Sequence, residues 1–554
     1  MVSVVALLFV NAQPASAAAD AGPVADGVYL ITSLHSGQAL DATGSTAEGA
    51  NVVQRPADKS PQQQWSLIST GDGAFRMAGV NSGLCLDTDG VRLRMTPCTD
   101  QTRQRWRITP DPVDGHRLTN VASGDNADVA GASLNQEAPV IQWPTNGHGN
   151  QRWKLTALPR VGAWANAVVA DGRSFGAQTL RMVVHADATG TAPRIKLSNR
   201  YGTGTLTIGR VDVAVQSFGP SAVAGSHRTA TFRGMTGTTI ASGAELRSDP
   251  LPMRVTAGQN LLVSLYLPVT TGPSTWHNLA YETTYISRTG DHTADDNGAD
   301  YSSTSTSWYF LSGMDLVSTT ATGTIVAFGD SITDGSTTTR GLNQRWPNRL
   351  AERLRDERGE QADGVVNLGI SGNRVVTDAP ATAQGVSAVT RFPADAFDQP
   401  GVHTVILLEG INDIGNLAGP NGTPLTAQHL IDGYRSIITT AHAKGIKVFG
   451  ATILPYRGAD YYTTEGETIR RQVNDWIRTT GHFDGHFDTA TALADNTDTT
   501  KLNSSYDSGD HLHPNAAGMQ AIADTIDLDA VTPLAVESPA EQNQDRAYTV
   551  AAER

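Results

Sequence analysis

The sequence predicts three folded regions in one chain: a repeat-built all-β region, a β-rich middle region and an α/β region with a parallel sheet. Three observations predict this division. A Gln-x-Trp triplet recurs three times in the first part of the chain, strand-like runs between turn residues fill the middle, and apolar strands alternate with helical stretches in the last part. A length of 554 residues allows three or four domains at about 150 residues each.

The composition limits the class of protein. Hydrophobic residues make up 39% of the chain, which is enough for several cores and too much for a mostly disordered protein. The formal net charge is −14, whereas a nucleic-acid-binding surface needs an excess of positive charge. We therefore expect no nucleic-acid partner. The 55 glycines and the 6% of aromatic residues indicate many turns and much β structure.

Residues 1–17 predict a secretory signal peptide. Val2 to Val10 is a short apolar run, and Pro14 and Ala15-Ser16-Ala17 follow it as a small-residue cleavage pattern. The run is shorter than the about 20 residues of a membrane span, and no later segment resembles one. We expect a secreted, extracellular protein that begins near Ala18. No Lys or Arg precedes the run, so the true signal could start upstream, and a disordered N-terminus is the alternative.

The N-terminal third repeats one unit. The triplets end in Trp65, Trp106 and Trp153, which are 41 and 47 residues apart, and a short strand-like run follows each of them. Three copies of one strand-rich unit can close into a pseudo-threefold β structure. Residues 26–157 resemble the ricin-B-type lectins, a family of β-trefoils. The resemblance implies that the three tryptophans pack in the central core and that a glycan, such as a polysaccharide, is the partner of this domain.

The same resemblance implies a sugar site. In this family an aspartate accepts hydrogen bonds from sugar hydroxyls, an aromatic ring stacks on the sugar, and an Asn or His completes the site. The first repeat offers Asp41 but has Arg55 at the aromatic position, and the second has Asp87 without an aromatic residue. We expect at most a weak site at Asp41 and a good one in the third repeat, where simple packing of the tryptophan is the alternative. The third repeat keeps the full set: Asp128, Trp143 and Asn150, with His148 nearby.

The two cysteines, Cys85 and Cys98, both lie in the second repeat. A disulfide between them would contribute about 3 kcal/mol by closing this loop, and an extracellular compartment would preserve it. A redox pair is disfavoured because the chain has no Cys-x-x-Cys motif, and two cysteines cannot form a four-cysteine zinc site. We expect no metal and no cofactor.

Residues 161–322 predict a β-sandwich or a jelly roll. Strand-like runs at 179–185, 194–198 and 261–267 are bounded by Gly, Thr, Ser and Pro, and no long segment has a helical period. Trp276-His277 is either a catalytic or sugar contact, or a packed aromatic residue beside a hydrogen-bonded histidine. We expect this domain to support the others or to position the substrate.

Residues 323–530 predict an α/β domain. Apolar strands that alternate with helices indicate a parallel sheet covered on both faces, and ligands gather at the carboxyl ends of such strands. The apolar runs predict strands at 324–328, 365–370, 404–408 and 447–454. Helices are predicted at 344–358, 427–443 and 465–479.

Three of these strands lead directly into polar motifs, and a fourth motif lies near the end of the domain. An Asp and a His three residues apart can lie on one turn, so that Asp510 orients His513 as the base for a nucleophilic Ser331. The backbone N–H groups of Ser331 and Gly372 and the amide of Asn412 would form an oxyanion hole. The four motifs are Gly329-Asp330-Ser331, Ser371-Gly372-Asn373, Gly410-Ile411-Asn412-Asp413 and Asp510-His511-Leu512-His513-Pro514.

These four blocks, in this order, resemble the GDSL-type or SGNH hydrolase family, with Ile332 where the family name has Leu. The resemblance covers 323–530. It implies a flavodoxin-like three-layer domain that hydrolyses carboxylic esters through a Ser331 acyl-enzyme.

Several neighbouring residues admit two interpretations. His511 is an alternative base or, with His513, one half of a metal site for which no third ligand is evident. Arg345-Trp346 and Glu409 either contact the substrate or support the site by packing and hydrogen bonding. We expect residues 531–554 to form a disordered tail.

Together these features predict a secreted serine esterase that deacylates, and most simply deacetylates, a polysaccharide to which its lectin domain binds. The first alternative is a secreted lipase or phospholipase with the same catalytic residues, which should show an apolar lid or an exposed apolar patch. The second is a carbohydrate-binding lectin without significant catalysis. The complete set of site residues argues against this second alternative.

Overall fold

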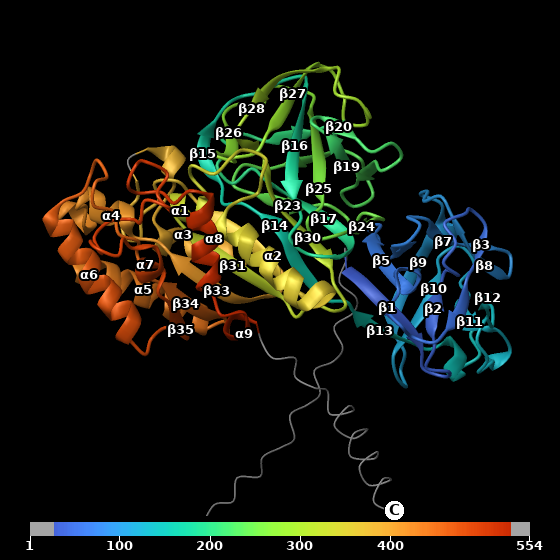
Figure 1. The fold of residues 1–554 in the computed structure, drawn as a ribbon. Helices are drawn as coiled ribbons and strands as arrows, with labels where there is room; N and C mark the ends of the chain where they lie inside the picture. Colours follow the sequence, from blue (N-terminus) through green and yellow to red (C-terminus); the bar gives the residue numbers. More distant parts are fainter. Residues whose placement is uncertain (1–26, 380, 533–554) are drawn as a thin grey trace, which may run out of the picture.

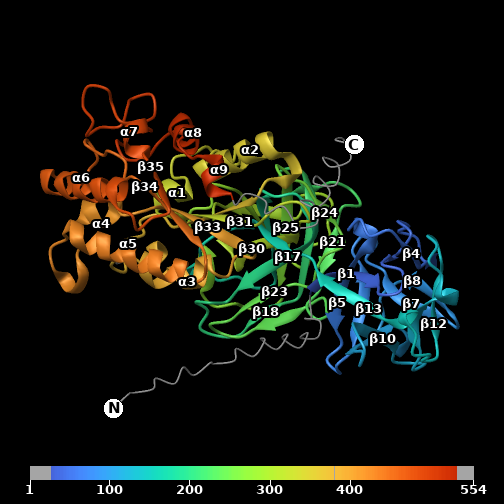
Figure 2. The same cartoon turned by 90° about the horizontal axis from the view of Figure 1, so that it is seen from below.

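The computed structural model describes residues 27–379 and 381–532. The predicted signal peptide, residues 1–17, and residues 533–554 of the predicted tail lie outside the described residues. The prediction that the tail starts at residue 531 is wrong, because Val531 ends a helix and both Val531 and Thr532 are buried. The three regions lie side by side in chain order: a β region at one end, a second β region in the middle and an α/β region at the other end (Figures 1 and 2). Within the described ranges, no helix has the length and apolar character that a membrane crossing needs.

The N-terminal region is an antiparallel sheet whose last strand pairs with its first, so that the three repeats close on one another. Trp65, Trp106 and Trp153 are fully buried in its core. Each indole N–H donates to the backbone carbonyl of the residue that precedes the aspartate of its repeat, which gives the repeats one shared geometry. The acceptors are the carbonyls of Leu40, Leu86 and Ala127, at 2.9, 3.1 and 3.1 Å.

This sheet has thirteen strands. They are β1 (Gly27–Ser33), β2 (Ala39–Asp41), β3 (Ala50–Asn51), β4 (Val53–Arg55), β5 (Gln64–Ser69), β6 (Phe75–Gly79), β7 (Cys85–Asp89), β8 (Arg92–Thr96), β9 (Arg105–Pro110), β10 (His116–Asn120), β11 (Asn126–Val129), β12 (Val140–Trp143) and β13 (Trp153–Ala157).

The middle region is antiparallel and β-rich, as its sequence predicts. A sheet in the order β14-β30-β17-β23 and a larger one in the order β20-β19-β25-β16-β27-β28 share one apolar core, to which Leu180, Ile195 and Met314 belong. The predicted strand-like runs fall in β16, β17 and β25. A jelly-roll topology stays a prediction.

The strands of the middle region are β14 (Arg160–Ala165), β15 (Val169–Gly172), β16 (Gln178–His185), β17 (Gly190–Ser198), β18 (Leu206–Ile208), β19 (Arg210–Phe218), β20 (Ser221–Ala222), β21 (Arg228–Ala230), β22 (Thr238–Ile240), β23 (Glu245–Arg247), β24 (Arg254–Val255), β25 (Asn260–Leu267), β26 (Ser274–His277), β27 (Thr284–Thr289), β28 (Tyr301–Ser305), β29 (Trp308–Tyr309) and β30 (Leu311–Val317).

The C-terminal region contains five parallel strands in the order β32-β31-β33-β34-β35, which is the doubly wound order 2-1-3-4-5. Helix α2 packs with α8, whereas α3, α5 and α6 pack among themselves. The two groups lie on opposite sides of the sheet (Figure 2), so both faces of the apolar strands are covered.

The strands of this region are β31 (Thr324–Gly329), β32 (Gly364–Gly369), β33 (Val402–Leu408), β34 (Lys447–Ala451) and β35 (Gly485–Phe487). Its helices are α1 (Ser331–Asp334), α2 (Trp346–Arg358), α3 (Ala388–Ala396), α4 (Ile411–Asn416), α5 (Ala427–His442), α6 (Thr464–Thr479), α7 (Thr489–Leu493), α8 (Ala516–Asp524) and α9 (Leu528–Val531).

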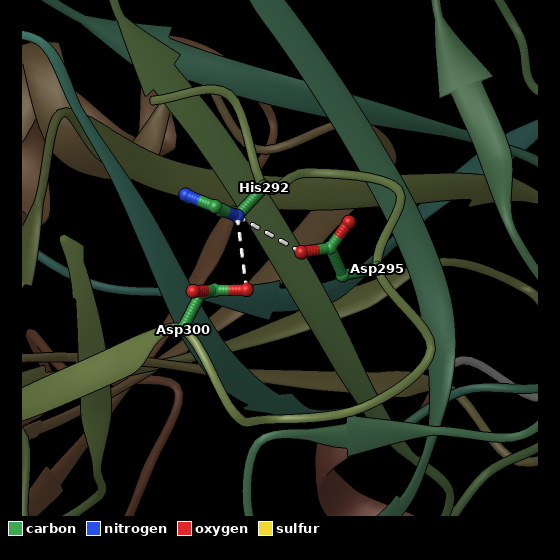
Figure 3. A group of neighbouring side chains, drawn as sticks. All are labelled: His292, Asp295 and Asp300. Atoms are coloured by element: carbon green, nitrogen blue, oxygen red, sulfur yellow. Dashed lines mark hydrogen bonds and ion pairs between the residues drawn. The ribbon is translucent and has the colours of Figure 1, made fainter. Parts of the chain in front are cut away.

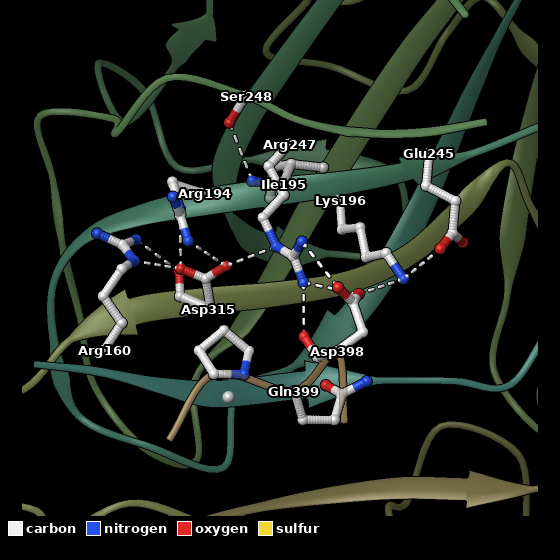
Figure 4. Close-up of polar contacts among 12 residues, drawn as sticks. Arg160, Arg194, Ile195, Lys196, Glu245, Arg247, Ser248, Asp315, Asp398 and Gln399 are labelled. Carbon is white, nitrogen blue, oxygen red and sulfur yellow. Dashed lines mark hydrogen bonds and ion pairs between the residues drawn. The ribbon is translucent and has the colours of Figure 1, made fainter. Parts of the chain in front are cut away.

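A partly buried network of charges joins the middle region to the C-terminal region (Figure 4). Asp398, which precedes β33, accepts Lys196 Nζ at 2.7 Å and Arg247 Nη2 at 2.8 Å. Arg247 also reaches the buried Asp315, which pairs with Arg160 and with Arg194. Because every buried carboxylate of the network has cationic partners, the two regions are joined by specific ion pairs as well as by apolar contact.

Candidate active site and candidate sugar site

Ser331 lies at the carboxyl end of β31, at the start of α1. Asp330 caps this short helix, since its carboxylate accepts the Ile332 N–H at 3.0 Å. A Cβ at Gly329 would lie 2.1 Å from the Leu408 carbonyl oxygen, so only glycine lets the two strands approach this closely. The serine is thus held at the edge of the sheet where ligands of such folds bind.

His513 contacts this serine. Its Nε2 lies 2.8 Å from Ser331 Oγ, and its Nδ1 lies 2.6 Å from Asp510 Oδ2. The other oxygen of Asp510 accepts the backbone N–H groups of Leu512 and His513 at 2.9 and 2.8 Å. Burial opposes the ionisation of Asp510, but these hydrogen bonds outweigh it and lower its pKa to about 2. The structure therefore brings the three predicted catalytic residues into one hydrogen-bonded chain.

His511 belongs to a different pair. Its Nδ1 lies 2.6 Å from Asp507 Oδ2, and more than half of its side chain is exposed. The two histidines of this loop are therefore held by separate carboxylates, and only His513 contacts Ser331.

The three predicted oxyanion donors follow neighbouring strands of the sheet. Gly372 lies in the turn after β32 with a φ of 81°, a left-handed conformation that glycine adopts readily. Asn412 lies in the first turn of α4, after β33, and its Nδ2 donates one hydrogen to the Asn373 carbonyl at 2.9 Å. Because β32, β31 and β33 are adjacent, Gly372, Ser331 and Asn412 gather at one edge.

The third repeat of the N-terminal region carries an open surface pocket of about 350 Å³. Trp143 is 49% exposed at its rim, so the side chain is not packed in the core. Asp128 accepts hydrogen bonds from Gln151 Nε2 at 2.9 Å and Asn146 Nδ2 at 3.2 Å, and burial raises the pKa of this carboxyl. The polar residues that line the pocket with Trp143 are Asp128, Asn146, His148 and Asn150.

Arginine covers the corresponding aspartate in the other two repeats. Arg55 lies 3.4 Å from the fully buried Asp41, and Arg103 lies 3.0 Å from Asp87. Gln63 Nε2 donates to the remaining oxygen of Asp41 at 3.1 Å. These contacts do not favour a sugar at Asp41, and the weak site there stays a prediction.

Comparison with known proteins identifies two parts of the chain. Residues 327–521 match the GDSL-like Lipase/Acylhydrolase family, and residues 27–153 match the Ricin-type beta-trefoil lectin domain. The chain contains a domain of each family. The two family resemblances predicted from the sequence are confirmed, and we call these parts the hydrolase domain and the lectin domain.

Solved structures of both kinds are similar to parts of the chain. A putative lipolytic protein of the G-D-S-L family from Desulfitobacterium hafniense DCB-2 is 20% identical, covering 36% of this chain and 96% of its own, with a TM-score of 0.28. The Rhizoctonia solani agglutinin is 23% identical, covering 25% and 99%, with a TM-score of 0.23. ThreeFoil, a designed 3-fold symmetric protein, is 36% identical, covering 24% and 98%, with a TM-score of 0.23. A comparison with curated proteins gave no match.

The predicted disulfide is present in the lectin domain, where Cys85 is bonded to Cys98. Within the described residues, one group of side chains has the spacing of metal ligands: His292, Asp295 and Asp300, in the loop between β27 and β28 (Figure 3). His292 Nδ1 lies 2.9 Å from Asp295 and 3.6 Å from Asp300. This histidine is thus engaged by both carboxylates, which are themselves partly exposed, and the loop belongs to the middle region rather than to the hydrolase site.

A layer of buried groups supports the hydrolase site. Arg391 donates to the carbonyls of Gly329 at 2.9 Å and Leu368 at 2.8 Å, which ties the ends of β31 and β32 together. Glu409 is buried and lies 3.5 Å from Arg391, so it supports this layer by pairing with that arginine. Asp413 accepts the N–H groups of Val375 and Val376, which follow Gly372, and burial raises its pKa to about 7.

The remaining ambiguous residues also support the site by packing. Trp346 is fully buried in the core of the hydrolase domain, and Arg345 is buried with its Nε donating to the Asp334 carbonyl at 2.7 Å. Sequence reasoning missed Tyr461, whose hydroxyl lies 3.5 Å from Asn412 Oδ1. Tyr461 lies in the loop between β34 and α6, where no motif marks it.

Proposed function

We propose that this protein is a secreted serine esterase that removes acyl groups, acetyl in the simplest case, from a polysaccharide held by its lectin domain. The observation that carries the proposal is the hydrogen-bonded chain from Ser331 Oγ through His513 to Asp510 at the carboxyl edge of the sheet. In such a chain the histidine can accept the serine proton while the carboxylate orients the ring and stabilises its charged form.

The reaction follows from these contacts. His513 Nε2 takes the proton from Ser331 Oγ as the oxygen attacks the carbonyl carbon of the ester. The proton then passes to the oxygen of the departing alcohol as the carbon–oxygen bond breaks, which leaves an acyl-enzyme on Ser331. In the second half, His513 takes a proton from water, the resulting hydroxide attacks the acyl group, and Ser331 recovers its proton as the carboxylic acid leaves.

The negative oxygen of each tetrahedral intermediate would be stabilised by the backbone N–H groups of Ser331 and Gly372 and by the Asn412 amide. An amide NH2 has two hydrogens. One of those on Asn412 is used by the Asn373 carbonyl, and the other remains to donate to the oxyanion. Removal of one such donor typically costs about 100- to 1,000-fold in kcat.

Two observations favour a polysaccharide over a lipid. Among the large apolar side chains in the described part of the hydrolase domain, Leu342 stands alone as strongly exposed, at 56%, whereas a lipid enzyme needs a broad apolar surface. The lectin domain presents an open pocket rimmed by Trp143. A polymer held there raises the local concentration of its ester groups near Ser331. The Cys85–Cys98 disulfide agrees with an extracellular location.

A panel of esters tests the hydrolase part of the proposal. Wild type and Ser331→Ala would be compared on p-nitrophenyl acetate, longer p-nitrophenyl esters, acetylated xylan and phosphatidylcholine. We expect hydrolysis that depends on Ser331 and is fastest for acetate. Equal activity in Ser331→Ala would refute the serine mechanism, and preferential release of long acyl chains would favour the lipase alternative.

Retention on immobilised polysaccharide tests the lectin part. Trp143→Ala should lower retention and leave the hydrolysis of p-nitrophenyl acetate unchanged, because the small ester does not need the lectin domain. Phe218→Ala is the matched control, since Phe218 is an aromatic side chain that is 85% exposed in the middle region. If the two variants are retained equally, the third repeat is not the sugar site.

A further inference from the structure

His277 of the middle region reaches into the hydrolase domain. It ends β26 and is buried, with its Nδ1 2.7 Å from the Ala167 carbonyl and its Nε2 3.0 Å from Asp334 Oδ1. Both ring nitrogens therefore face oxygen acceptors. Asp334 is the last residue of α1, the short helix that Ser331 begins. The histidine thus contacts the hydrolase domain within one helical turn of the nucleophile.

Asp334 also contacts the turn that carries the Gly372 N–H, which we call the oxyanion turn. Its second oxygen, Oδ2, accepts the Ser371 backbone N–H at 3.1 Å and the Ser371 hydroxyl at 2.7 Å. Ser371 immediately precedes Gly372. One carboxylate therefore holds His277 on one side and both polar groups of Ser371 on the other.

A second residue of the middle region supports Ser371. The Tyr281 hydroxyl donates to Ser336 Oγ at 3.0 Å, and Ser336 Oγ lies 3.2 Å from Ser371 Oγ. Arg345 of the hydrolase domain also links the two domains here, since it donates to the carbonyls of both Asp334 and Ala280. The oxyanion turn is therefore tied to the middle region through two separate side-chain routes.

The direction of the Gly372 N–H depends on Ser371. This N–H belongs to the peptide group between the two residues, so its orientation is set by the backbone torsions on either side of that peptide. Ser371 is fixed by the two hydrogen bonds that it donates to Asp334, and the left-handed φ of Gly372 completes the turn. If Asp334 were free to rotate, the turn would lose the partner that fixes Ser371, and the N–H would lose its alignment.

We propose that His277 is a positioning residue for ester hydrolysis: by holding Asp334 it fixes Ser371 and so aims the Gly372 N–H at the oxyanion. This rests on the proposed function. The docking of the two domains does not require His277, because the ion pairs of Asp398 and a shared apolar core already join them. The middle region would then contribute to the active site and would not act as a spacer alone.

The test compares His277→Ala and His277→Gln with the wild-type protein on p-nitrophenyl acetate. A misplacement of about 1 Å in an active site can cost about 100-fold. We expect His277→Ala to lower kcat about 10- to 100-fold with KM nearly unchanged, because the Gly372 N–H matters in the transition state and not in ground-state binding. The glutamine variant keeps an N–H donor near Nε2 and should regain most of the activity.

Inhibition by phenylboronic acid adds a readout that a merely structural role would not move. This acid forms a tetrahedral adduct with the catalytic serine, so its affinity reports on the oxyanion hole. Its inhibition constant should rise in His277→Ala by about the factor that kcat falls. The matched control is His227→Ala, which removes another histidine–aspartate pair of the middle region, His227–Asp212, and should leave kcat and the inhibition constant unchanged.

Two results would overturn the proposal: kcat in His277→Ala within about twofold of wild type, or a fall in kcat without weaker boronate inhibition. If His277→Ala does not fold, His277→Phe, which fills the same space without an N–H donor, and Ser371→Ala decide. Each should lower kcat, and His277→Phe should add little to the loss of Ser371→Ala in the double variant, whereas fully additive losses contradict a shared route. Activity that survives Ser331→Ala would instead refute the proposed function itself.

Discussion

Replacing Asp510 by Asn tests whether His513 is held in the tautomer that a base needs. Asp510 Oδ1 accepts the N–H groups of Leu512 and His513 at 2.9 and 2.8 Å, and Oδ2 accepts the His513 Nδ1–H at 2.6 Å. The two backbone groups can only donate, so the carbonyl oxygen of an Asn must face them. Its NH2 group then donates to Nδ1, which places the ring proton on Nε2, where it points at Ser331.

A ring that already carries its proton on Nε2 cannot accept the proton of Ser331. We expect kcat on p-nitrophenyl acetate to fall on the order of 10⁴-fold, the loss that accompanies the wrong tautomer in a Ser-His-Asp site, with KM little changed. Burial opposes ionisation of Asp510, but the hydrogen bonds from His513 and Leu512 outweigh it and hold its pKa at about 2. The wild-type carboxylate therefore stays charged at the assay pH, so the loss reports on the tautomer of His513 and not on protonation of Asp510.

Asp507→Asn is the matched control in the same loop. Asp507 Oδ2 pairs with His511 Nδ1 at 2.6 Å, and Oδ1 accepts the N–H groups of Gly509 and His511 at 2.8 and 3.0 Å. The substitution therefore disturbs the same kind of contact without touching His513, and kcat should stay within about threefold of wild type. Equal losses in the two variants, or a loss below about tenfold in Asp510→Asn, would refute the reasoning.

Three further predictions concern stability and are read from chemical or thermal unfolding of the full chain. Asp398→Ala removes one of two carboxylate partners from Lys196, which keeps Glu245, and from Arg247, which keeps Asp315, and should cost about 1 to 3 kcal/mol. The exposed pair of Asp432 gives a control, Asp432→Ala, that costs less than about 1 kcal/mol. Replacing both Cys85 and Cys98 by Ser opens a loop with a sequence separation of 13 and should lower lectin-domain stability by about 3 kcal/mol. Asp413 has a folded pKa raised by burial to about 7, so it contributes stability that is fully present below about pH 4 and is lost as the pH rises to 7. Asp413→Asn removes this dependence. The unfolding free energy of the variant minus that of wild type should therefore rise by about 4 kcal/mol between pH 4 and pH 7.

Each of these predictions has a contradicting result. Equal costs for Asp398→Ala and Asp432→Ala would show that the ion pairs of Asp398 do not stabilise the domain contact. A lectin-domain transition that is insensitive to loss of the disulfide would contradict the loop argument. A constant difference between Asp413→Asn and wild type from pH 4 to pH 7 would mean that Asp413 is not protonated in the folded state.

The arrangement of the candidate hydrolase residues could be inferred from the sequence because it follows from local rules. Ser331, Gly372 and Asn412 each follow an apolar strand, and parallel strands place their carboxyl ends at one edge. Asp510 and His513 are three residues apart, so one turn suffices to join them. The position of each residue could be inferred from its own neighbourhood in the chain.

Contacts between distant parts of the chain left no such signal. His277 and Asp334 are 57 residues apart and belong to different domains, so their contact depends on how the domains dock. For the same reason Trp276-His277 allowed two interpretations in the sequence. Strand β35 was missed because its three residues, Gly485–Phe487, are too few to show a pattern. The cover of Asp41 by Arg55 likewise needs the folded strand pair β2 and β4.

Under the proposed function, the cover of two lectin aspartates by arginine would affect how long the protein stays bound to a polymer. Three open sites could bridge neighbouring polymer chains, and the protein would dissociate only when all three sites were unoccupied at once. With Asp41 and Asp87 paired to Arg55 and Arg103, the third repeat would bind by itself, and a single dissociation step would free the molecule. Residence at any one place would then be as short as that of one sugar contact. Such an enzyme would bind and dissociate repeatedly, and would hydrolyse the ester groups within reach during each binding event.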